Sequence, residues 1–190
     1  MTALRVGLLF GLVLHKLVWE LLKRRDPGLS GPSGPAAPPA KRLLKGIKAL
    51  LLVCLAIQTL FLDLFPIAER PAALRVVGTS LYVVGLSIAV AGRVQLGPNW
   101  VDLEDARIRP GQSLVAHGLY RYVRHPIYAG DLLLLIGLEL ALNSWLVLGA
   151  LIPLVVVLRQ AAEEETLLAR AFPDYGAYRA GTKRFIPFVL

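Results

Sequence analysis

Apolar residues form a few long runs along the chain, and polar residues gather between those runs. Residues 4–22, 43–65 and 73–96 are strongly apolar and carry their charges mainly near the ends. An α-helix rises 1.5 Å per residue, so about 20 residues cross the roughly 30 Å hydrocarbon core of a bilayer. The pattern therefore predicts three membrane-spanning helices in the first half of the chain. A signal peptide at 4–22 is disfavoured, because a basic cluster follows the run rather than preceding it.

Two shorter apolar runs, 128–142 and 145–158, come later in the chain with only Asn143 and Ser144 between them. Each covers about 20 to 24 Å as a helix, which favours a tight helical hairpin that crosses the bilayer partly or where it is thin. Pro153 is expected to kink the second arm. With an amphipathic helix and tail at 159–190, the pattern predicts an all-α integral membrane protein with about five membrane segments.

The polar connections divide the chain into two regions. Residues 26–41 hold five prolines and three glycines, a density that no helix or strand tolerates, so a loop is predicted there. The polar stretch 97–124 is longer than a simple connection requires. We therefore expect an N-terminal region, 1–96, with three helices and the proline-rich loop. A catalytic region, 97–190, would hold the polar loop, the hairpin at 128–158 and the C-terminal helix.

Composition and charge agree with a membrane protein. Hydrophobic residues make up 56% of the chain, above the level typical of soluble domains. The net charge of +8 is typical of some nucleic-acid-binding proteins. However, if the loop at 26–41 is cytoplasmic, only Arg5, Arg70 and Arg75 among the 21 Lys and Arg residues fall outside. This asymmetry puts the N-terminus outside and 97–127 in the cytoplasm, and it makes anionic lipid, rather than nucleic acid, the expected partner.

Two polar clusters are expected to meet at the cytoplasmic face. In the first, Pro126 can occupy the first turn of the hairpin and His125 its positively polarised end. In the second, Arg159 and Glu163 lie four residues apart on one helix face, from which Glu164 turns away.

Three further acidic residues have distinct expectations. Glu165 is expected on a solvated face, as in most charge runs. Asp131 and Glu139 lie within the apolar hairpin, where an ionisable group is costly and is a functional candidate. The single cysteine, Cys54, excludes an internal disulfide and a thiolate metal cluster, and we expect no metal.

The pattern G-x-Y-x-x-x-R-H-P-x-Y-x-G spans residues 118–130. It resembles the signature of the isoprenylcysteine carboxyl methyltransferase family and its phospholipid methyltransferase relatives. A second block is similar too, and comprises Arg159, Glu163, Glu164, Leu167, Phe172, Tyr175, Tyr178 and Arg184 to Pro187. The resemblance covers about 97–190. It departs from the family in the proline-rich loop and in Phe172-Pro173-Asp174, which replaces a common Phe-Gly pattern.

The resemblance implies an S-adenosylmethionine-dependent enzyme whose cofactor enters from the cytoplasm and whose lipid-like or prenylated substrate enters from the bilayer. It assigns catalysis and substrate binding to Arg159 and Glu163. It assigns cofactor binding to Gln112, Ser113, Leu114, Val115, Tyr120, His125, Pro126, Ile127 and Tyr128.

The chemistry of methyl transfer distinguishes two acceptors. Transfer from a sulfonium to a carboxylate starts from opposite charges, so holding the pair in line in a dry site helps more than an acid or base. Arg159 suits a carboxylate, because a guanidinium binds its oxygens in a fixed geometry. A phospholipid amine would instead have to lose a proton, with Glu163 or His125 as general base. The leading hypothesis is O-methylation of a carboxylate on a prenylated or lipid-like substrate.

Two readings outside this class remain. A sterol-type reductase using NADPH also places R-H-P-x-Y-x-G before a hairpin, but Ile127, Asp131 and residues 163–165 do not supply its expected Asn, Glu and D-E-x-R-C block. A non-catalytic membrane scaffold would use the polar clusters only as interface anchors. The compact chain favours a bacterial inner membrane over the endoplasmic reticulum.

Overall fold

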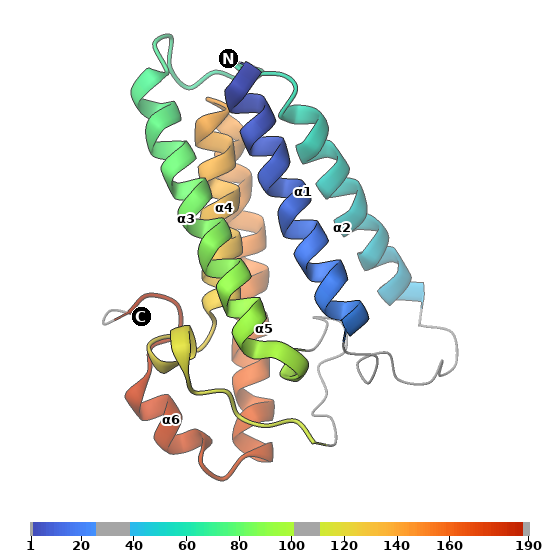
Figure 1. Cartoon of the computed structure of the whole chain (residues 1–190), viewed down its shortest axis with the longest axis vertical. Helices are drawn as coiled ribbons and strands as arrows, with labels where there is room; N and C mark the ends of the chain where they lie inside the picture. The colour runs from blue at the N-terminus through green and yellow to red at the C-terminus, as the bar shows by residue number, and fades with distance from the viewer. Residues whose placement is uncertain (1, 26–38, 101–110, 188–190) are drawn as a thin grey trace.

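The computed structural model describes residues 2–25, 39–100 and 111–187, which form a bundle of long helices with a polar assembly at one end (Figure 1). The described residues contain no β-strand, which confirms the predicted all-α class. The α-helices are α1 (Thr2–Arg25), α2 (Pro39–Gln58), α3 (Ala72–Leu96), α4 (Pro126–Ala141), α5 (Leu151–Ala171) and α6 (Tyr175–Gly181). Short 3₁₀ helices are η2 (Gly97–Asn99), η4 (Gly118–Arg121) and η5 (Trp145–Ala150).

Three helical stretches are long and apolar enough to cross a membrane: Thr2–Arg25, Ala72–Asn99 and Trp145–Ala171. A shorter apolar helix covers Gly46–Gln58, and α4 has 16 residues. Apolar side chains on α1, α2, α3 and α5 are widely exposed, as expected where lipid rather than protein covers them. The chain is therefore an integral membrane protein with a helical fold.

The second predicted span ends earlier than expected. The sequence indicated a helix over 43–65, whereas α2 ends at Gln58. The following residues fold instead against the hairpin turn, where buried Asn143 adopts a positive φ of 57°. Its side-chain amide donates to Asp63 Oδ1 (2.6 Å) and to the carbonyl of Ala68 (2.9 Å), and its Oδ1 accepts from the backbone amide of Ala68 (2.9 Å). These bonds take the place of helical hydrogen bonds after Gln58, so the apolar pattern overestimated the length of the helix.

The hairpin forms as predicted, and Pro153 lies near the point where its second arm changes from a 3₁₀ helix to an α-helix. That residue lies in the first turn of α5, just after the 3₁₀ helix η5, where a backbone N–H has no intrahelical partner to lose. Helix α5 then continues without interruption to Ala171 and so includes the start of the predicted C-terminal helix. Its polar second half, from Arg159 onward, extends beyond the ends of the other long helices (Figure 1).

Helices α3 and α4 pack backbone to backbone through glycines. A Cβ at Gly85 would meet the backbone of Leu133 and Leu134, and one at Gly137 would meet the backbone of Tyr82. Small residues of this kind allow close helix approach inside membranes. Helix α1 joins this pair through apolar packing and through a hydrogen bond from the Tyr82 hydroxyl to the carbonyl of Leu8 (2.7 Å). The start of α4 is thereby fixed against the end of α3.

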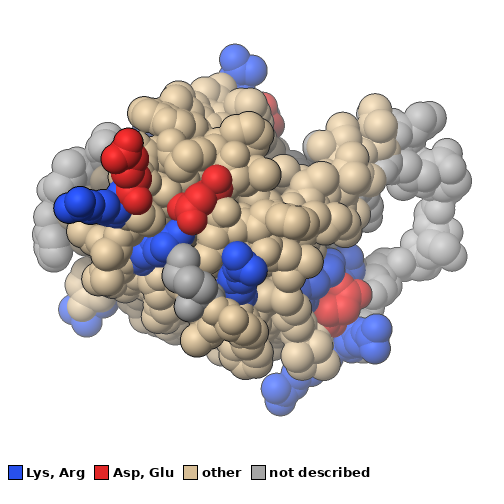
Figure 2. Space-filling view, turned by 90° about the horizontal axis from the view of Figure 1, so that it is seen from above, with Lys and Arg blue, Asp and Glu red and all other residues tan. Residues whose placement is uncertain are grey.

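The two ends of the bundle differ in charge. Figure 2, which views the end that carries the N-terminus, shows only scattered basic and acidic residues on a largely uncharged surface. At the opposite end, α1 finishes with Lys23, Arg24 and Arg25. The polar assembly lies toward that second end (Figure 1).

Substituting Gly85 by Ala should destabilise the protein by about 2 kcal/mol or more, because the new methyl group has no space against the α4 backbone. Gly7→Ala in α1 is the matched control, since nothing lies within 4 Å of its Cβ position. Thermal unfolding in detergent should show a lower Tm for Gly85→Ala and an equal or higher Tm for Gly7→Ala. Equal Tm values for Gly85→Ala and the unsubstituted protein would contradict this packing.

Candidate active site

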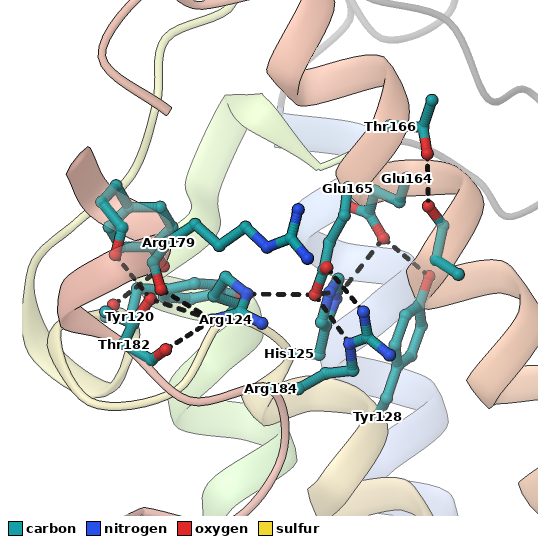
Figure 3. A network of polar contacts seen from close by, with 12 residues as sticks. Tyr120, Arg124, His125, Tyr128, Glu164, Glu165, Thr166, Arg179, Thr182 and Arg184 are labelled. Atoms are coloured by element: carbon teal, nitrogen blue, oxygen red, sulfur yellow. Dashed lines mark hydrogen bonds and ion pairs between the residues drawn. The ribbon is translucent and has the colours of Figure 1, made fainter. Parts of the chain in front are cut away.

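Three segments that lie far apart in the sequence meet in one place (Figure 3). They are the motif around Arg124, the projecting half of α5 and the C-terminal segment after α6. Backbone hydrogen bonds join the motif to the tail. The amide of Arg124 donates to the carbonyl of Lys183 (2.8 Å), and the amide of His125 donates to that of Arg184 (3.1 Å). The tail is therefore held in register with the motif.

Glu165 lies at the centre of this assembly with only 4% of its surface exposed. Arg184 binds it in a bidentate manner, with Nε at 2.9 Å and Nη2 at 2.8 Å. Arg124 Nε donates to it at 3.0 Å, and His125 Nε2 lies 3.3 Å from the same oxygen. The expectation that Glu165 faces solvent is therefore wrong. In a run of three glutamates, only the packing of the helix decides which carboxylate turns inward.

The environment of Glu165 keeps it ionised. Burial would raise the pKa of this carboxyl, but hydrogen bonds from His125, Arg184 and Arg124 outweigh burial and hold the pKa well below its usual range. An ionised carboxylate that already receives these donors is a structural anchor rather than a proton acceptor. On the other side of Arg124, its Nη1 donates to the carbonyls of Thr182 and Arg179, which ties the same guanidinium to the C-terminal segment.

Two tyrosines of the C-terminal segment close this side of the site. Burial raises the pKa of Tyr175 to about 12 and that of Tyr178 further, so both hydroxyls stay protonated. The Tyr178 hydroxyl donates to the backbone carbonyl of Tyr120 (2.9 Å), which links α6 to η4.

A partly open cavity lies next to the Glu165 assembly. Of the residues predicted to bind a cofactor, eight line it: Gln112, Ser113, Leu114, Val115, Tyr120, His125, Ile127 and Tyr128. Pro126 does not line the cavity. It is buried at the first position of α4, where it starts the helix that carries Tyr128.

The end of α3 shapes the loop that forms one wall. Gly118 has a φ of 59°, and its close approach to Gln95 leaves no room for a side chain. Gln95 Oε1 accepts the backbone amide of Leu119 (2.7 Å). Asn99 Oδ1 likewise accepts the amide of Ser113 (2.7 Å). Sequence reasoning did not single out this support, because both side chains lie outside the motif.

Arg159 and Glu163, the residues predicted to act on the substrate, are exposed on α5 and do not line the cavity. No ion pair joins them within the part of the chain that the structure describes. Instead Glu164 lines the cavity, accepts the Tyr128 hydroxyl at 3.1 Å and lies 3.7 Å from His125 Nδ1. The roles of Arg159 and Glu163 stay predictions. Other lining residues that sequence reasoning did not assign to the cofactor are Leu96, Asn99, Arg124, Leu168, Tyr175 and Tyr178.

Comparison with known proteins identifies the class. The model of the phospholipid methyltransferase family matches residues 73–175, which is more than half of the chain. The chain therefore belongs to the phospholipid methyltransferase family, and the resemblance described from its motifs is confirmed. The match includes α3, α4 and α5 and most of the cavity lining.

Two individual proteins are similar to part of the chain. The chain is similar to the cobalt-zinc-cadmium resistance protein CzcN of Cupriavidus metallidurans, with 33% identity over 57% of this chain and 48% of that protein. It is also similar to the nickel-cobalt-cadmium resistance protein NccN of Alcaligenes xylosoxydans xylosoxydans, with 32% identity over 61% of this chain and 51% of that protein. The chain thus spans about half the length of these relatives.

A solved structure shares the fold. The eukaryotic intramembrane Ras methyltransferase ICMT superimposes with a TM-score of 0.56 and 18% identity, covering 98% of this chain and 68% of that chain. At this level of identity the match concerns the arrangement of helices, and it supports the integral membrane fold.

Glu165→Gln should lower the free energy of unfolding by about 3 kcal/mol at pH 7, because two guanidinium groups would lose their carboxylate partner. Since the folded-state pKa of Glu165 is depressed, its contribution is complete above the unfolded value of about 4.3 and declines as the pH falls below it. The difference in Tm between the two proteins should therefore shrink between pH 5 and pH 3. Glu163→Gln is the exposed control, and equal Tm values for both variants at pH 7 would contradict the assignment.

Proposed function

We propose that this protein transfers a methyl group from S-adenosylmethionine to a lipid-like acceptor at the surface of its membrane. The observation that carries the proposal is the cavity formed between residues 112–128 and the polar half of α5. It lies where membrane helices end, so water and lipid would both have access. Membership of the phospholipid methyltransferase family supports the same activity.

The chemistry of the lining fits this cofactor. Tyr120, Tyr128 and His125 offer aromatic faces, which attract a cationic sulfonium. Leu114 and Leu168 supply apolar contacts suited to a nucleobase. When bound, the cofactor would supply an electrophilic methyl group carried on a positively charged sulfur.

The acidic side chain of the lining can bind the ammonium group of the cofactor. The Glu164 side chain is 41% exposed and is held by the Tyr128 hydroxyl, so its carboxylate is oriented and still accessible. The role we propose for His125 is to hold its ring in a fixed orientation at the cavity wall. Its Nε2 faces Glu165 and its Nδ1 faces Glu164, which fixes the ring plane beside Tyr128, with ring centroids 5.4 Å apart.

The acceptor is proposed to be a lipid-like or prenylated molecule that reaches the site from the bilayer. In the carboxylate reading, Arg159 would bind the acceptor from the end of the apolar half of α5, where a long side chain can reach the headgroup region. The cationic side chain that lines the cavity, Arg124, is already engaged by Glu165. Carboxylate O-methylation therefore depends on Arg159.

The proposed orientation has the site at the cytoplasmic face, and we favour a bacterial inner membrane. The basic end of α1, with Lys23, Arg24 and Arg25, supports this orientation, because basic residues concentrate on the cytoplasmic side.

Glu164→Gln should weaken S-adenosylmethionine binding by at least about tenfold, because a charged hydrogen-bond acceptor is lost from the cavity. Glu163→Gln, its neighbour on the exposed side, is the matched control and should bind as the unsubstituted protein does. Isothermal titration calorimetry in detergent measures both. The opposite ranking would contradict the proposed role of Glu164. Binding of NADPH instead would favour a reductase, and binding of neither cofactor would favour a scaffold.

A further inference from the structure

A second ionisable pair lies inside the membrane helices, outside the cavity. Nε2 of His15 on α1 lies 2.9 Å from Oδ1 of Asp131 on α4. The His15 ring stacks on Trp19, with centroids 4.0 Å apart and an interplanar angle of 22°. Ionisable side chains on membrane-spanning helices are costly and are functional candidates. Because neither residue lines the cavity, the role of this pair has to be explained separately.

Asp131 of this pair lies one helical turn from a residue that lines the cavity. Asp131 follows Tyr128 by three residues, so both lie on one face of α4, with Asp131 one turn further along the helix. Tyr128 lines the cavity and donates to Glu164. Because α4 runs from the cavity into the apolar bundle, the His15–Asp131 pair lies on the bilayer side of Tyr128. A lipid-borne acceptor would approach from this side.

Both members of the pair have unused hydrogen-bonding capacity. Within the described residues, each is the only side-chain hydrogen-bond partner of the other. The His15 side chain is 24% exposed and that of Asp131 is 42% exposed, so a ligand can reach them. When Nε2 of His15 carries the proton and donates a hydrogen bond to Asp131, Nδ1 has a lone pair that can accept a proton. A carboxylate that fixes an imidazole in this way creates an oriented base.

Other candidate bases near the cavity are already engaged. Glu165 is ionised by its guanidinium partners, and both nitrogens of His125 face glutamates. On α1, the charged neighbours Lys16 and Glu20 pair with each other at 3.6 Å and are exposed. The His15–Asp131 pair therefore has the accessible imidazole nitrogen that these groups lack.

We propose that His15 and Asp131 form the acceptor subsite for the methyl transfer proposed above, on which this inference rests, and that the subsite takes a lipid head group with a protonated amine. Asp131 attracts the ammonium group. One N–H bond of the ammonium then breaks, its electron pair stays on the nitrogen, and the proton bonds to Nδ1 of His15. The resulting imidazolium is balanced by Asp131, and the amine gains the lone pair that methyl transfer requires. A carboxylate acceptor would meet Asp131 with like charge and has no proton to lose.

The test compares His15→Gln and Asp131→Asn with Lys16→Gln, a control on the same helix whose side chain is exposed and pairs with Glu20. The probes are phosphatidylethanolamine and, as a carboxylate acceptor, N-acetyl-S-farnesylcysteine, each in mixed micelles with labelled S-adenosylmethionine. The protein should methylate the amine probe, giving a product stable to alkali. His15→Gln should lower kcat for that probe by about 100-fold or more and remove the acidic limb of its pH profile. Asp131→Asn should raise the KM for the amine probe about tenfold. Cofactor affinity and Tm should be unchanged in both.

Three results would overturn the inference. The first is preference for the carboxylate probe, seen as alkali-labile label released as methanol. The second is unchanged kcat and KM in both variants. The third is a loss of activity that only follows a loss of Tm, which would make the pair a tie between α1 and α4. If the unsubstituted protein binds no S-adenosylmethionine and methylates neither probe, the proposed function fails, and this inference fails with it.

Discussion

The buried carboxylate of Glu165 is the constraint on which the site depends. A charge in a poorly hydrated position is tolerated only when it is paired and hydrogen-bonded. Here the partners come from two other segments, because Arg124 and His125 precede α4 whereas Arg184 belongs to the tail. One ionised group therefore assembles three parts of the chain, and the cavity wall is complete only when all three are in place. Arg124 serves this assembly, which is why we do not assign it to a substrate.

The membrane bundle supplies the rigid side of the same site. Glycines bring α3 and α4 into backbone contact, which fixes the start of α4 relative to Gln95 at the end of α3 and Asn99 in η2. The cavity thus has one wall built by close helix packing and another built by ion pairs around Glu165. Acidic groups with exposed surface, Glu164 and Asp131, remain on the sides from which a cationic cofactor and a lipid head group would approach.

Much of this organisation could be predicted from the sequence. The apolar runs indicated the long helices, the Asn143-Ser144 break indicated the hairpin, and the motif at 118–130 indicated the loop that lines the cavity. Contacts distant in sequence could not be predicted. Helix α2 ends early because Asn143 binds the segment that follows it, and a local pattern contains no sign of that bond.

The three consecutive glutamates were ambiguous for a related reason. Adjacent positions on a helix differ by 100° in direction, so composition alone does not tell which of them faces the motif. Residues 26–38 of the predicted loop lie outside the described residues, as do 101–110, whereas residues 39–41, also predicted as loop, begin α2.

The central claim is that the cavity between residues 112–128 and α5 is the cofactor site. The most direct measurement is an experimental structure of the protein in a lipid nanodisc with S-adenosylhomocysteine. The account predicts density for the nucleoside against Tyr120 and Tyr128, with the amino-acid portion near the Glu164 carboxylate. Density elsewhere, or beside Arg159 and Glu163 on the exposed side of α5, would contradict it.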